Sequence, residues 1–377
     1  MLNDPINKRY HRQIILDGFG ESGQQKLLDA KVLVIGAGGL GCPALLYLAA
    51  AGVGQIGIID DDAVSIENLH RQVLFTTDDI GLPKTLAAAK RLKALNPATD
   101  ITEYPFRLTP ESCMEIFPNY DMILDCTDNF ATRYMINDAC VLLHKPLVSA
   151  AVSQYEGQLA VFQVTGGHDE EPVNYRDLFP EPPPDGLIRN CGEAGILGVL
   201  PGIIGTLQAN ETIKLITGIG VTLANRLLTF DIRTNTMTEL VLTRSDHRNQ
   251  SMPADTQAFL QMEYERPCHT ETTVVEIGAS TFDMMLKEPD VVAVDVREPH
   301  EHPPVTEFKH LRLPLSVMHE GPKPITARKV VFFCQTGVRS LQAASMLAAA
   351  RPGAYEVFSL RGGIMQWKAQ QKKSQHD

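Results

Sequence analysis

A glycine-rich turn between two short runs constrains the fold of this chain more than any other feature. A β-branched, apolar run at residues 31–35 leads directly into the pattern G-x-G-x-x-G at residues 36–41, and an alanine- and leucine-rich run follows to residue 51. Its glycines are Gly36, Gly38, Gly39 and Gly41. Glycines at this spacing let the backbone turn tightly and approach a phosphate group at a helix N-terminus. The pattern predicts a strand–loop–helix unit that binds a nucleotide.

Strand-like and helix-like runs continue to alternate beyond this turn, up to about residue 242. Such alternation predicts a Rossmann-like α/β fold, with a doubly wound parallel sheet between helices. Extended runs at 159–164, 227–231 and 238–242 predict an antiparallel extension, which makes the sheet mixed. The other predicted strands cover residues 31–35, 55–59, 100–103, 122–125 and 146–150.

The chain divides into two predicted domains. The first covers residues 1–245, and the second, a smaller α/β domain, covers residues 274–377. The polar stretch 246–273 between them shows no sustained period and is predicted to be a linker. A proline-rich, irregular stretch at 166–195 interrupts the first domain, and a loop of that length is usually functional or disordered.

Charge and composition exclude several classes of protein. The 34 Lys and Arg residues against 45 Asp and Glu residues give a formal net charge of -11, which disfavours nucleic-acid binding. The longest apolar stretch, 194–207, contains Pro201 and is too short to cross a membrane. The start of the chain is polar, which predicts no secretory signal. Seven scattered cysteines favour a reducing cytoplasm over a disulfide scaffold.

Polar residues beyond the glycine turn distinguish two kinds of nucleotide. Asp60 ends the next predicted strand, where an acid would hold ribose hydroxyl groups, so NAD is one candidate. Arg71 and Lys84 follow, and a triphosphate needs such cations more than the pyrophosphate of NAD does. Asp128 and Asn129 follow a later strand at the carboxyl edge of the sheet, where Asp128 could hold Mg²⁺. Each cation alone could be a solvated surface charge, but the joint pattern favours ATP with Mg²⁺.

These motifs together resemble the ThiF/MoeB/HesA family, bacterial relatives of the ubiquitin-activating enzymes. The resemblance covers about residues 9–242 and rests on residues 9–16, the glycine turn, residues 68–72, Lys84 and residues 126–129. It implies that ATP adenylates the C-terminal Gly-Gly carboxylate of a small ubiquitin-like sulfur carrier protein. Fixed cations suit this reaction, because the attack of a carboxylate on the α-phosphate builds negative charge.

The same resemblance implies roles for individual residues. Asp60 would bind the ribose, and Asp128 would support Mg²⁺. Arg12 resembles an arginine that the family supplies from the partner subunit, which implies a homodimer. The residues implied to lie against or contact the phosphates are Gly39, Asn68, Arg71 and Lys84.

The chain departs from this family where other members commonly bind structural zinc through two C-x-x-C pairs. Asn174 and Asp177 stand where the first pair would be, and residues 245–250 contain no cysteine. Cys268 and His269 form an isolated pair within the predicted linker. Structural zinc needs four cysteine or histidine ligands at close spacing, so no zinc site is predicted.

The cysteines of the first domain divide into two groups. Cys191 ends the proline-rich stretch, before an apolar run, and matches the cysteine that this family links covalently to the carrier. A thiol at a helix entrance is a better nucleophile, whereas the structural alternative is a small buried residue at a helix start. The remaining cysteines, predicted to lie in the core, are Cys42, Cys113, Cys126 and Cys140.

A second reactive cysteine is predicted between a strand at 329–333 and a helix at 341–350. The loop residues are Cys334, Gln335, Thr336, Gly337, Val338 and Arg339. Backbone N–H groups, the helix dipole and the charge of Arg339 would stabilise a thiolate or a persulfide on Cys334. Cysteine phosphatases share this design, but their arginine comes six positions after the cysteine, and here it comes five positions after.

Further motifs at 294–301 and 360–367 complete a resemblance between residues 274–367 and a single-domain rhodanese. Asp295 and Arg297, in the first of these motifs, are predicted to anchor the structure rather than to react. The usual glycine-rich stretch after that motif is replaced by the sequence Pro-Pro-Val-Thr at 303–306, a departure that concerns the edge of the domain and not the Cys334 loop.

The combined hypothesis is an enzyme in which a sulfur-carrier adenylyltransferase is fused to a sulfurtransferase. Cys334 would take sulfur from thiosulfate or a cysteine desulfurase persulfide and pass it, directly or with Cys191, to the adenylated carrier as a thiocarboxylate. The resemblance favours the molybdopterin-synthase carrier over the thiazole (thiamine) carrier or another one. Two alternatives stay open: an NAD-linked oxidoreductase with a phosphatase-like tail, and a non-catalytic carrier-binding scaffold with only rhodanese activity.

Overall fold

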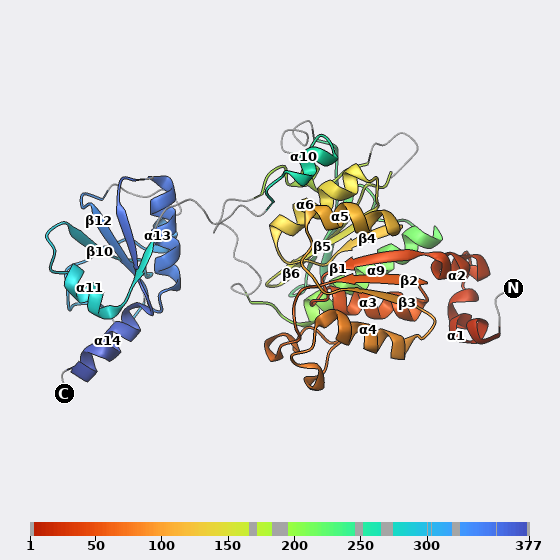
Figure 1. Cartoon of the computed structure of the whole chain (residues 1–377), viewed down its shortest axis with the longest axis horizontal. Helices are drawn as coiled ribbons and strands as arrows, with labels where there is room; N and C mark the ends of the chain where they lie inside the picture. Colours follow the sequence, from red (N-terminus) through yellow and green to blue (C-terminus); the bar gives the residue numbers. More distant parts are fainter. Residues whose placement is uncertain are drawn as a thin grey trace. The chain divides into compact units, whose positions relative to one another are not determined.

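The computed structural model shows two compact units, residues 1–265 and residues 266–377 (Figure 1). It describes residues 4–165, 172–182, 195–245, 252–264, 274–299, 301–302, 304–318, 325–351 and 353–374. No helix in these ranges is both long enough and apolar enough to cross a lipid bilayer.

An eight-stranded mixed sheet forms the centre of the first unit, in the order β3-β2-β1-β4-β5-β6-β7-β8. The strands from β3 to β5 pair in parallel, and β6, β7 and β8 extend the sheet with antiparallel pairs. The strands are β1 (Lys31–Ile35), β2 (Gln55–Ile59), β3 (Asp100–Tyr104), β4 (Met122–Asp125), β5 (Leu147–Ser153), β6 (Glu156–Phe162), β7 (Arg226–Asp231) and β8 (Thr236–Val241). The predicted doubly wound, mixed α/β sheet is confirmed.

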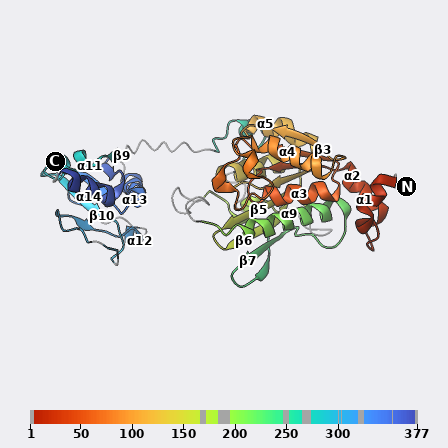
Figure 2. The ribbon, with the colours of Figure 1, turned by 90° about the horizontal axis from the view of Figure 1, so that it is seen from below.

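Helices cover both faces of this sheet (Figure 1). Those of the first unit are α1 (Asp4–Ile14), α2 (Gly20–Asp29), α3 (Gly41–Ala51), α4 (Lys84–Leu95), α5 (Pro110–Ile116), α6 (Phe130–Leu142), α7 (Tyr175–Leu178), α9 (Val199–Thr217) and α10 (Thr256–Leu260). One buried cluster packs α3, α4 and α9 against the sheet, and another packs α5, α6 and α10 against the opposite face. Figure 2 shows α3 and α9 side by side on their face.

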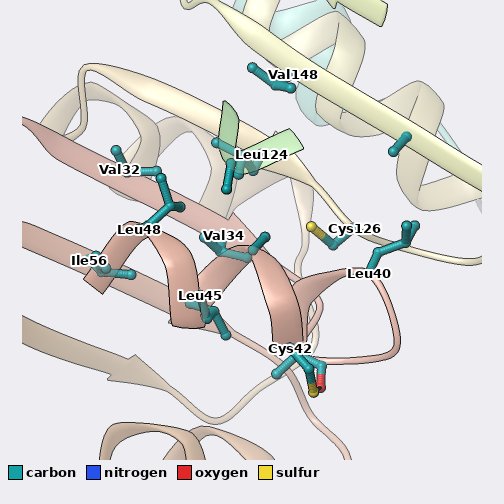
Figure 3. Packing of buried hydrophobic residues seen from close by; sticks show 14 of the residues in the cluster. Val32, Val34, Leu40, Cys42, Leu45, Leu48, Ile56, Leu124, Cys126 and Val148 are labelled. Atoms are coloured by element: carbon teal, nitrogen blue, oxygen red, sulfur yellow. Dashed lines mark hydrogen bonds between the residues drawn. The ribbon is translucent and has the colours of Figure 1, made fainter. Parts of the chain in front are cut away.

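The packing between β1 and α3 fixes the glycine turn that joins them (Figure 3). Val32 and Val34 of β1 and Leu45 and Leu48 of α3 are all fully buried in one cluster. Apolar burial of this kind stabilises each side chain by about 1.5–3 kcal/mol, so strand and helix hold both ends of the turn in place. Cys42, at the start of α3, lies in the same cluster, and burial raises the pKa of its thiol to about 12.

The cysteines predicted to lie in the core are confirmed there. Burial raises the pKa of each of their thiols, which makes them poor nucleophiles at neutral pH. These buried residues are Cys42, Cys113, Cys126 and Cys140.

Residues 252–264 differ from the linker predicted at 246–273, because they pack on the first unit. Asp255 caps α10 by accepting the N–H of Ala258 at 2.8 Å, and Phe259 is fully buried in the cluster that contains α5 and α6. The Tyr264 hydroxyl donates to Asp138 at 2.7 Å. The prediction was wrong for these residues because a helix of five residues is too short to show a helical period.

The second unit contains a five-stranded, entirely parallel sheet in the order β11-β10-β12-β13-β9. Its strands are β9 (Val275–Ile277), β10 (Val291–Asp295), β11 (Leu311–Arg312), β12 (Lys329–Phe333) and β13 (Glu356–Leu360), and its helices are α11 (Ala279–Met285), α12 (Leu315–Met318), α13 (Val338–Ala350) and α14 (Gly363–Ser374). One buried cluster packs α12 and α13 on one face, and the other packs α11 and α14 on the opposite face. The topology brings the carboxyl ends of β10 and β12 to one edge of the sheet.

Candidate active sites

A cavity of about 390 Å³ lies where β1, β2 and β4 end in the first unit. It gathers most of the residues predicted to bind the nucleotide, although they are spread over about ninety positions of the sequence. The predicted residues that line it are Gly36, Gly38, Gly39, Asp60, Asn68, Arg71, Lys84, Asp128 and Asn129. Gly41 and Arg12 are not part of this lining, and Arg12 is exposed near the end of α1.

The glycine turn needs its glycines for two different reasons. Gly36 has a φ of +93°, and a Cβ atom there would lie 2.9 Å from the carbonyl oxygen of Cys126. A Cβ atom at Gly41 would lie 1.9 Å from the carbonyl oxygen of Gly36, which no side chain can tolerate. Gly41 therefore closes the turn onto the helix, whereas Gly36, Gly38 and Gly39 line the cavity.

Asp60, at the end of β2, braces the same turn. Its two carboxylate oxygens accept the backbone N–H groups of Ala37 at 2.7 Å and Asp62 at 2.9 Å. Burial raises the pKa of Asp60 above its ordinary value, and the nearby Lys84 ammonium opposes that shift. The carboxylate at the cavity wall is thus held in a fixed orientation.

Two cations line the cavity on side chains that are held by neighbouring groups. Lys84 begins α4, is 4% exposed and places its Nζ 2.6 Å from Asp62 and 3.8 Å from Asp60. Arg71 donates to the side-chain oxygen of Asn68 at 2.7 Å and to the carbonyl oxygen of Glu67 at 3.2 Å. Fixed cations beside a glycine turn suit a polyphosphate, because they neutralise charge without reorganising.

Asp128 and Asn129 follow β4 and differ in what they do. Asn129 caps α6 by accepting the N–H of Thr132 at 2.9 Å. Asp128 is exposed and, in the part of the chain that the structure describes, has no hydrogen-bond or ion-pair partner, so its carboxylate is available to a cation in the cavity.

Three other acids line the cavity beside β2. The carboxylates of Asp60, Asp61 and Asp62 lie within 4.8 Å of one another, the one group of three potential metal ligands found among the described residues. Lys84 already pairs with Asp60 and Asp62. Asp128 therefore fits Mg²⁺ better, since that ion is commonly held by one or two carboxylates together with substrate phosphates.

Sequence reasoning missed several residues of this cavity. Gln72 is 3% exposed, and its Oε1 has no hydrogen-bond partner. Arg107, in the loop after β3, lines the cavity as well, and so does Arg133 of α6. Gln72 directly follows Arg71 in the sequence, and Arg133 lies one helical turn after Asn129, so position relative to the predicted residues could have found both.

A second cavity of about 360 Å³ adjoins the first. Its lining comes from β5, β6 and the region of α7 and is mainly apolar, with Leu159, Phe162, Tyr175 and Phe179 among its residues. The residues that line both cavities are Asp128, Asn129, Arg133 and Val152. The two cavities therefore meet beside the end of β4.

The positions where the family's first zinc-binding pair would stand form hydrogen bonds instead. Asn174 accepts the N–H of Arg176 at 2.8 Å, and Asp177 accepts the N–H of Asn174 at 2.8 Å. Asp177 also accepts the N–H of Ser245 at 2.8 Å, which joins two segments far apart in the sequence. Residues 246–250, the pair Cys268 and His269, and the predicted nucleophile Cys191 lie outside the described residues.

Cys334 follows β12 and is fully buried at the base of its loop. The N–H of Gly337 donates to Sγ at 3.1 Å, and Sγ lies 3.6 Å from the hydroxyl of Ser340. Gly337 has a φ of +102°, and a Cβ atom there would lie 2.9 Å from the backbone nitrogen of Gly362. Helix α13 begins at Val338, earlier than predicted, so Val338 and Arg339 belong to its first turn.

Arg339, which is predicted to add positive charge beside Cys334, is paired with an acid and also interacts electrostatically with Cys334. Its guanidinium forms two hydrogen bonds with Glu301, at 2.5 and 2.7 Å. The Arg339 guanidinium lowers the pKa of Glu301 to about 2, so the pair is charged on both sides at neutral pH and its net charge is zero. The groups that contact the sulfur atom directly are the N–H of Gly337 and the hydroxyl of Ser340.

The residues predicted to anchor this unit are buried as a pair. Arg297 is fully buried and donates through Nε and Nη2 to Asp295, at 2.9 and 2.7 Å. The Nη1 of Arg297 lies 3.5 Å from the side-chain oxygen of Gln335, which connects the pair to the Cys334 loop.

Comparison with known proteins agrees with this division. Residues 10–252 match the model of the ThiF family, and residues 279–370 match that of the Rhodanese-like domain. A sulfur carrier protein adenylyltransferase of Thermus thermophilus is 52% identical over 237 residues, which are 63% of this chain and 88% of the relative. The probable adenylyltransferase/sulfurtransferase MoeZ of Mycobacterium tuberculosis is 39% identical over 373 residues, which are 96% of this chain and 93% of the relative.

Solved structures support the fold of the first unit. A crystal structure of Escherichia coli MccB with ATP has a TM-score of 0.54 and 24% identity, over 65% of this chain and 73% of that chain. A structure of PaaA has a TM-score of 0.55 and 22% identity, over 65% of this chain and 76% of that chain. At this level of identity the likeness concerns the fold alone.

Proposed function

This chain belongs to the ThiF family and carries a rhodanese-like domain, and from that premise we propose that its two units act in sequence on one small protein. The chain is an enzyme of the adenylyltransferase and sulfurtransferase class. In our proposal, ATP first adenylates the C-terminal glycine of a ubiquitin-like sulfur carrier, and sulfur then replaces the AMP. The carrier leaves as a thiocarboxylate.

The observation that carries this proposal is the convergence of fixed cations on a glycine turn. Arg71 and Lys84 line one cavity together with Gly36, Gly38 and Gly39. In our proposal the two cations and Asn68 bind the phosphates, and Asp60 holds the ribose while it braces the turn. The cations stabilise the charge that builds when the carrier carboxylate attacks the α-phosphate and pyrophosphate leaves.

Asp128 is our candidate to hold Mg²⁺, since its carboxylate is free in the described part of the chain and lines the cavity. When bound, Mg²⁺ neutralises phosphate charge and orients the leaving pyrophosphate. Asn129 keeps Asp128 in place indirectly, because it caps the helix that follows.

The second cavity is our candidate for the tail of the carrier. Its mainly apolar lining suits an extended peptide, and it meets the nucleotide cavity beside Asp128 and Val152. A tail that ends in Gly-Gly is narrow and can bring its carboxylate to that junction. The tail then lies in one cavity and ATP lies in the other.

Sulfur transfer would take place at Cys334. The thiolate takes the outer sulfur atom of thiosulfate or of a cysteine desulfurase persulfide, and the donor leaves as sulfite or as a thiolate. The outer sulfur of the Cys334 persulfide attacks the acyl carbon of the adenylate and expels AMP. A second thiol, for which Cys191 is our candidate, then attacks the Cys334 sulfur, forms a disulfide and releases the thiocarboxylate.

We favour the carrier of molybdopterin synthase, with the thiazole carrier as the alternative, and a cytoplasmic location. One experiment tests the reaction and the carrier together: ATP–pyrophosphate exchange with a panel of small carriers that end in Gly-Gly. Exchange with one carrier would support the chemistry and identify the pathway. Absence of exchange with every carrier, in folded protein that binds ATP, would contradict the proposal.

We also propose a homodimer in which Arg12 reaches the cavity of the partner subunit. Arg12 is exposed, and its neighbours Ile15 and Leu16 are 54% and 57% exposed, which is unusual apolar surface for a free helix end. Mixing Arg12→Ala protein with Asp128→Ala protein tests this. If Arg12 acts between subunits, random pairing restores about a quarter of the sites, whereas action within one subunit restores none.

A further inference from the structure

Arg133 lies where the nucleotide cavity and the second cavity meet. It belongs to the first turn of α6 and lines both cavities. Among the described residues, it is the one Lys, Arg or His in the lining of the second cavity, whose only acids are Asp128 and Glu156. Because Arg133 is the one cation in this mainly apolar lining, an anion that enters the second cavity would be neutralised beside Arg133.

The guanidinium of Arg133 is held rigidly but has capacity left for another partner. Arg133 is 8% exposed, its Nη2 donates to the carbonyl oxygen of Thr127 at 2.8 Å, and its central carbon lies 5.8 Å from the centre of the Phe130 ring. Its side chain also forms a hydrogen bond with Tyr175. Its Nε is buried and has no hydrogen-bond partner. A buried donor without an acceptor is costly, and in folded proteins a water molecule, an ion or a ligand usually satisfies such a group.

The reaction proposed above brings an anion to this junction. The carrier carboxylate must approach the negatively charged α-phosphate, and the two like charges repel each other. In the proposed function Arg71 and Lys84 bind the phosphates, and both are already paired with protein oxygens. Neither of them lines the second cavity.

We propose that Arg133 is a positioning residue that binds the C-terminal carboxylate of the carrier and holds it beside the α-phosphate. This inference rests on the proposed function and deepens it. Nε and one Nη of an arginine present two parallel donors, which match the two oxygens of a carboxylate. The contact to Thr127 fixes the plane of the guanidinium, so that the carboxylate is oriented as well as neutralised.

The proposal predicts a coupling between Arg133 and the carboxylate itself. The test uses the full chain, a nonhydrolysable α,β-methylene analogue of ATP, and the carrier that supports pyrophosphate exchange. That carrier is prepared once with its free C-terminal carboxylate and once as the C-terminal amide. We expect the unsubstituted chain to bind the free acid about 10- to 100-fold more tightly than the amide, the range for a hydrogen bond to a charged group.

In Arg133→Met, we expect the acid and the amide to bind equally, both about as weakly as the amide binds to the unsubstituted chain. Binding of the ATP analogue without carrier is measured separately, because Arg133 also lines the nucleotide cavity and any loss there affects the acid and the amide alike. The matched control is Arg107→Met, because Arg107 lines the nucleotide cavity alone. That variant should keep the full preference for the acid. A merely structural role of Arg133 would weaken the acid and the amide to the same degree, and this result would overturn the proposal.

Arg133→Lys covers the case in which the methionine variant does not fold. Lysine keeps the charge but loses the paired donors, so a smaller preference for the acid, about threefold, should remain. A preference equal to that of the unsubstituted chain would contradict the proposal. Failure of the proposed function would look different, because the unsubstituted chain itself would then show no pyrophosphate exchange with any carrier.

Discussion

The two units of this chain handle negative charge in different ways. In the first, the charged groups Asp60, Lys84 and Arg71 line a cavity and are held there by neighbouring polar groups. In the second, the sulfur of Cys334 accepts a backbone N–H group, and the nearby cation of Arg339 is paired with Glu301. A polyphosphate carries several negative charges, which are stabilised by cationic side chains fixed in place, whereas a short loop of backbone N–H groups can stabilise one sulfur atom.

This difference determines which substitutions harm which unit. In the first site, charged side chains provide the contacts. Replacing a single charged side chain should therefore remove adenylation activity without changing the backbone. In the second site, backbone geometry provides much of the contact to the sulfur atom. A small change of loop shape should therefore lower sulfurtransferase activity as much as a change of charge does.

The largest expected effect is that of Cys334→Ala on sulfur transfer. The variant has no thiol to carry a persulfide, so thiosulfate sulfurtransferase activity should fall to the background level. ATP–pyrophosphate exchange should stay within about twofold of the unsubstituted chain, since the two reactions use separate groups. Both are measured on the same preparation. Loss of exchange in folded Cys334→Ala protein would refute the division of the two reactions.

Asp128→Ala is the reciprocal change. Loss of the carboxylate that we assign to Mg²⁺ should lower ATP–pyrophosphate exchange by about 10³-fold, as expected when a fixed electrostatic contact to the reacting phosphates is removed. Thiosulfate sulfurtransfer should be unaffected. Asp128→Asn serves as the control, because it retains an oxygen ligand without the charge and should keep more activity at high Mg²⁺ concentration. Equal activity of Asp128→Ala and the unsubstituted chain would contradict the role of Asp128.

Gly337→Ala tests the part that the backbone plays in the second site. Gly337 combines a φ of +102° with a neighbouring backbone nitrogen 2.9 Å from the position of a Cβ atom. The loop must shift, and a shift of about 1 Å around reacting groups can cost about 10²-fold in rate. We expect sulfurtransferase activity to fall by that amount. Pyrophosphate exchange should not change.

The matched control for that prediction is Gly353→Ala. Gly353 also has a positive φ, +73°, but open space surrounds the position of its Cβ atom. Both variants should lose about 1–3 kcal/mol of stability from backbone strain. Trp367 is the only tryptophan of the chain and is buried in the second unit, so its fluorescence reports the unfolding of that unit. If Gly353→Ala lowers the rate as much as Gly337→Ala does, strain rather than loop shape explains the loss.

Local patterns in the sequence were sufficient to predict the strands, helices and glycine turn at the centre of the first unit. The glycine turn, the strand at 31–35 and the helix after it depend on neighbouring residues, and the structure confirms them. The proximity of Lys84 and Asp128 could also be predicted from the sequence, because parallel strands bring their carboxyl ends together at one edge of the sheet.

Features that depend on contacts between distant segments could not be predicted in this way. The second cavity forms where β5, β6 and α7 pack, and no motif marks that packing in the sequence. The bond between Asp177 and Ser245 spans 68 positions. The ion pair of Glu301 and Arg339 joins the segment after β10 to the first turn of α13, 38 positions apart, and no local pattern marks it.

The smallest effect that we predict concerns this ion pair and its dependence on pH. Arg339 lowers the pKa of Glu301 to about 2, below the ordinary value of 4.5 for the group. A carboxyl group with a lowered pKa in the folded state stabilises that state above the ordinary pKa, and this contribution is lost as the pH falls from about 4.5 towards 2. The side chains of Arg339 and Glu301 are 30% and 21% exposed, so solvent screening limits the contribution to about 1 kcal/mol.

Glu301→Gln should therefore lower the unfolding free energy of the second unit by about 1 kcal/mol at pH 7, and the difference should shrink as the pH is lowered to 3.5. Denaturant unfolding followed by Trp367 fluorescence measures it in the full chain. Glu288→Gln is the control, since its pair with Lys329 is more exposed, at 43% for Glu288, and should contribute less. A loss that is equal at both pH values would mean that the charge of Glu301 does not stabilise the loop. Arg339 would then be available to the sulfur atom, and the contrast between the two units would be smaller than the structure indicates.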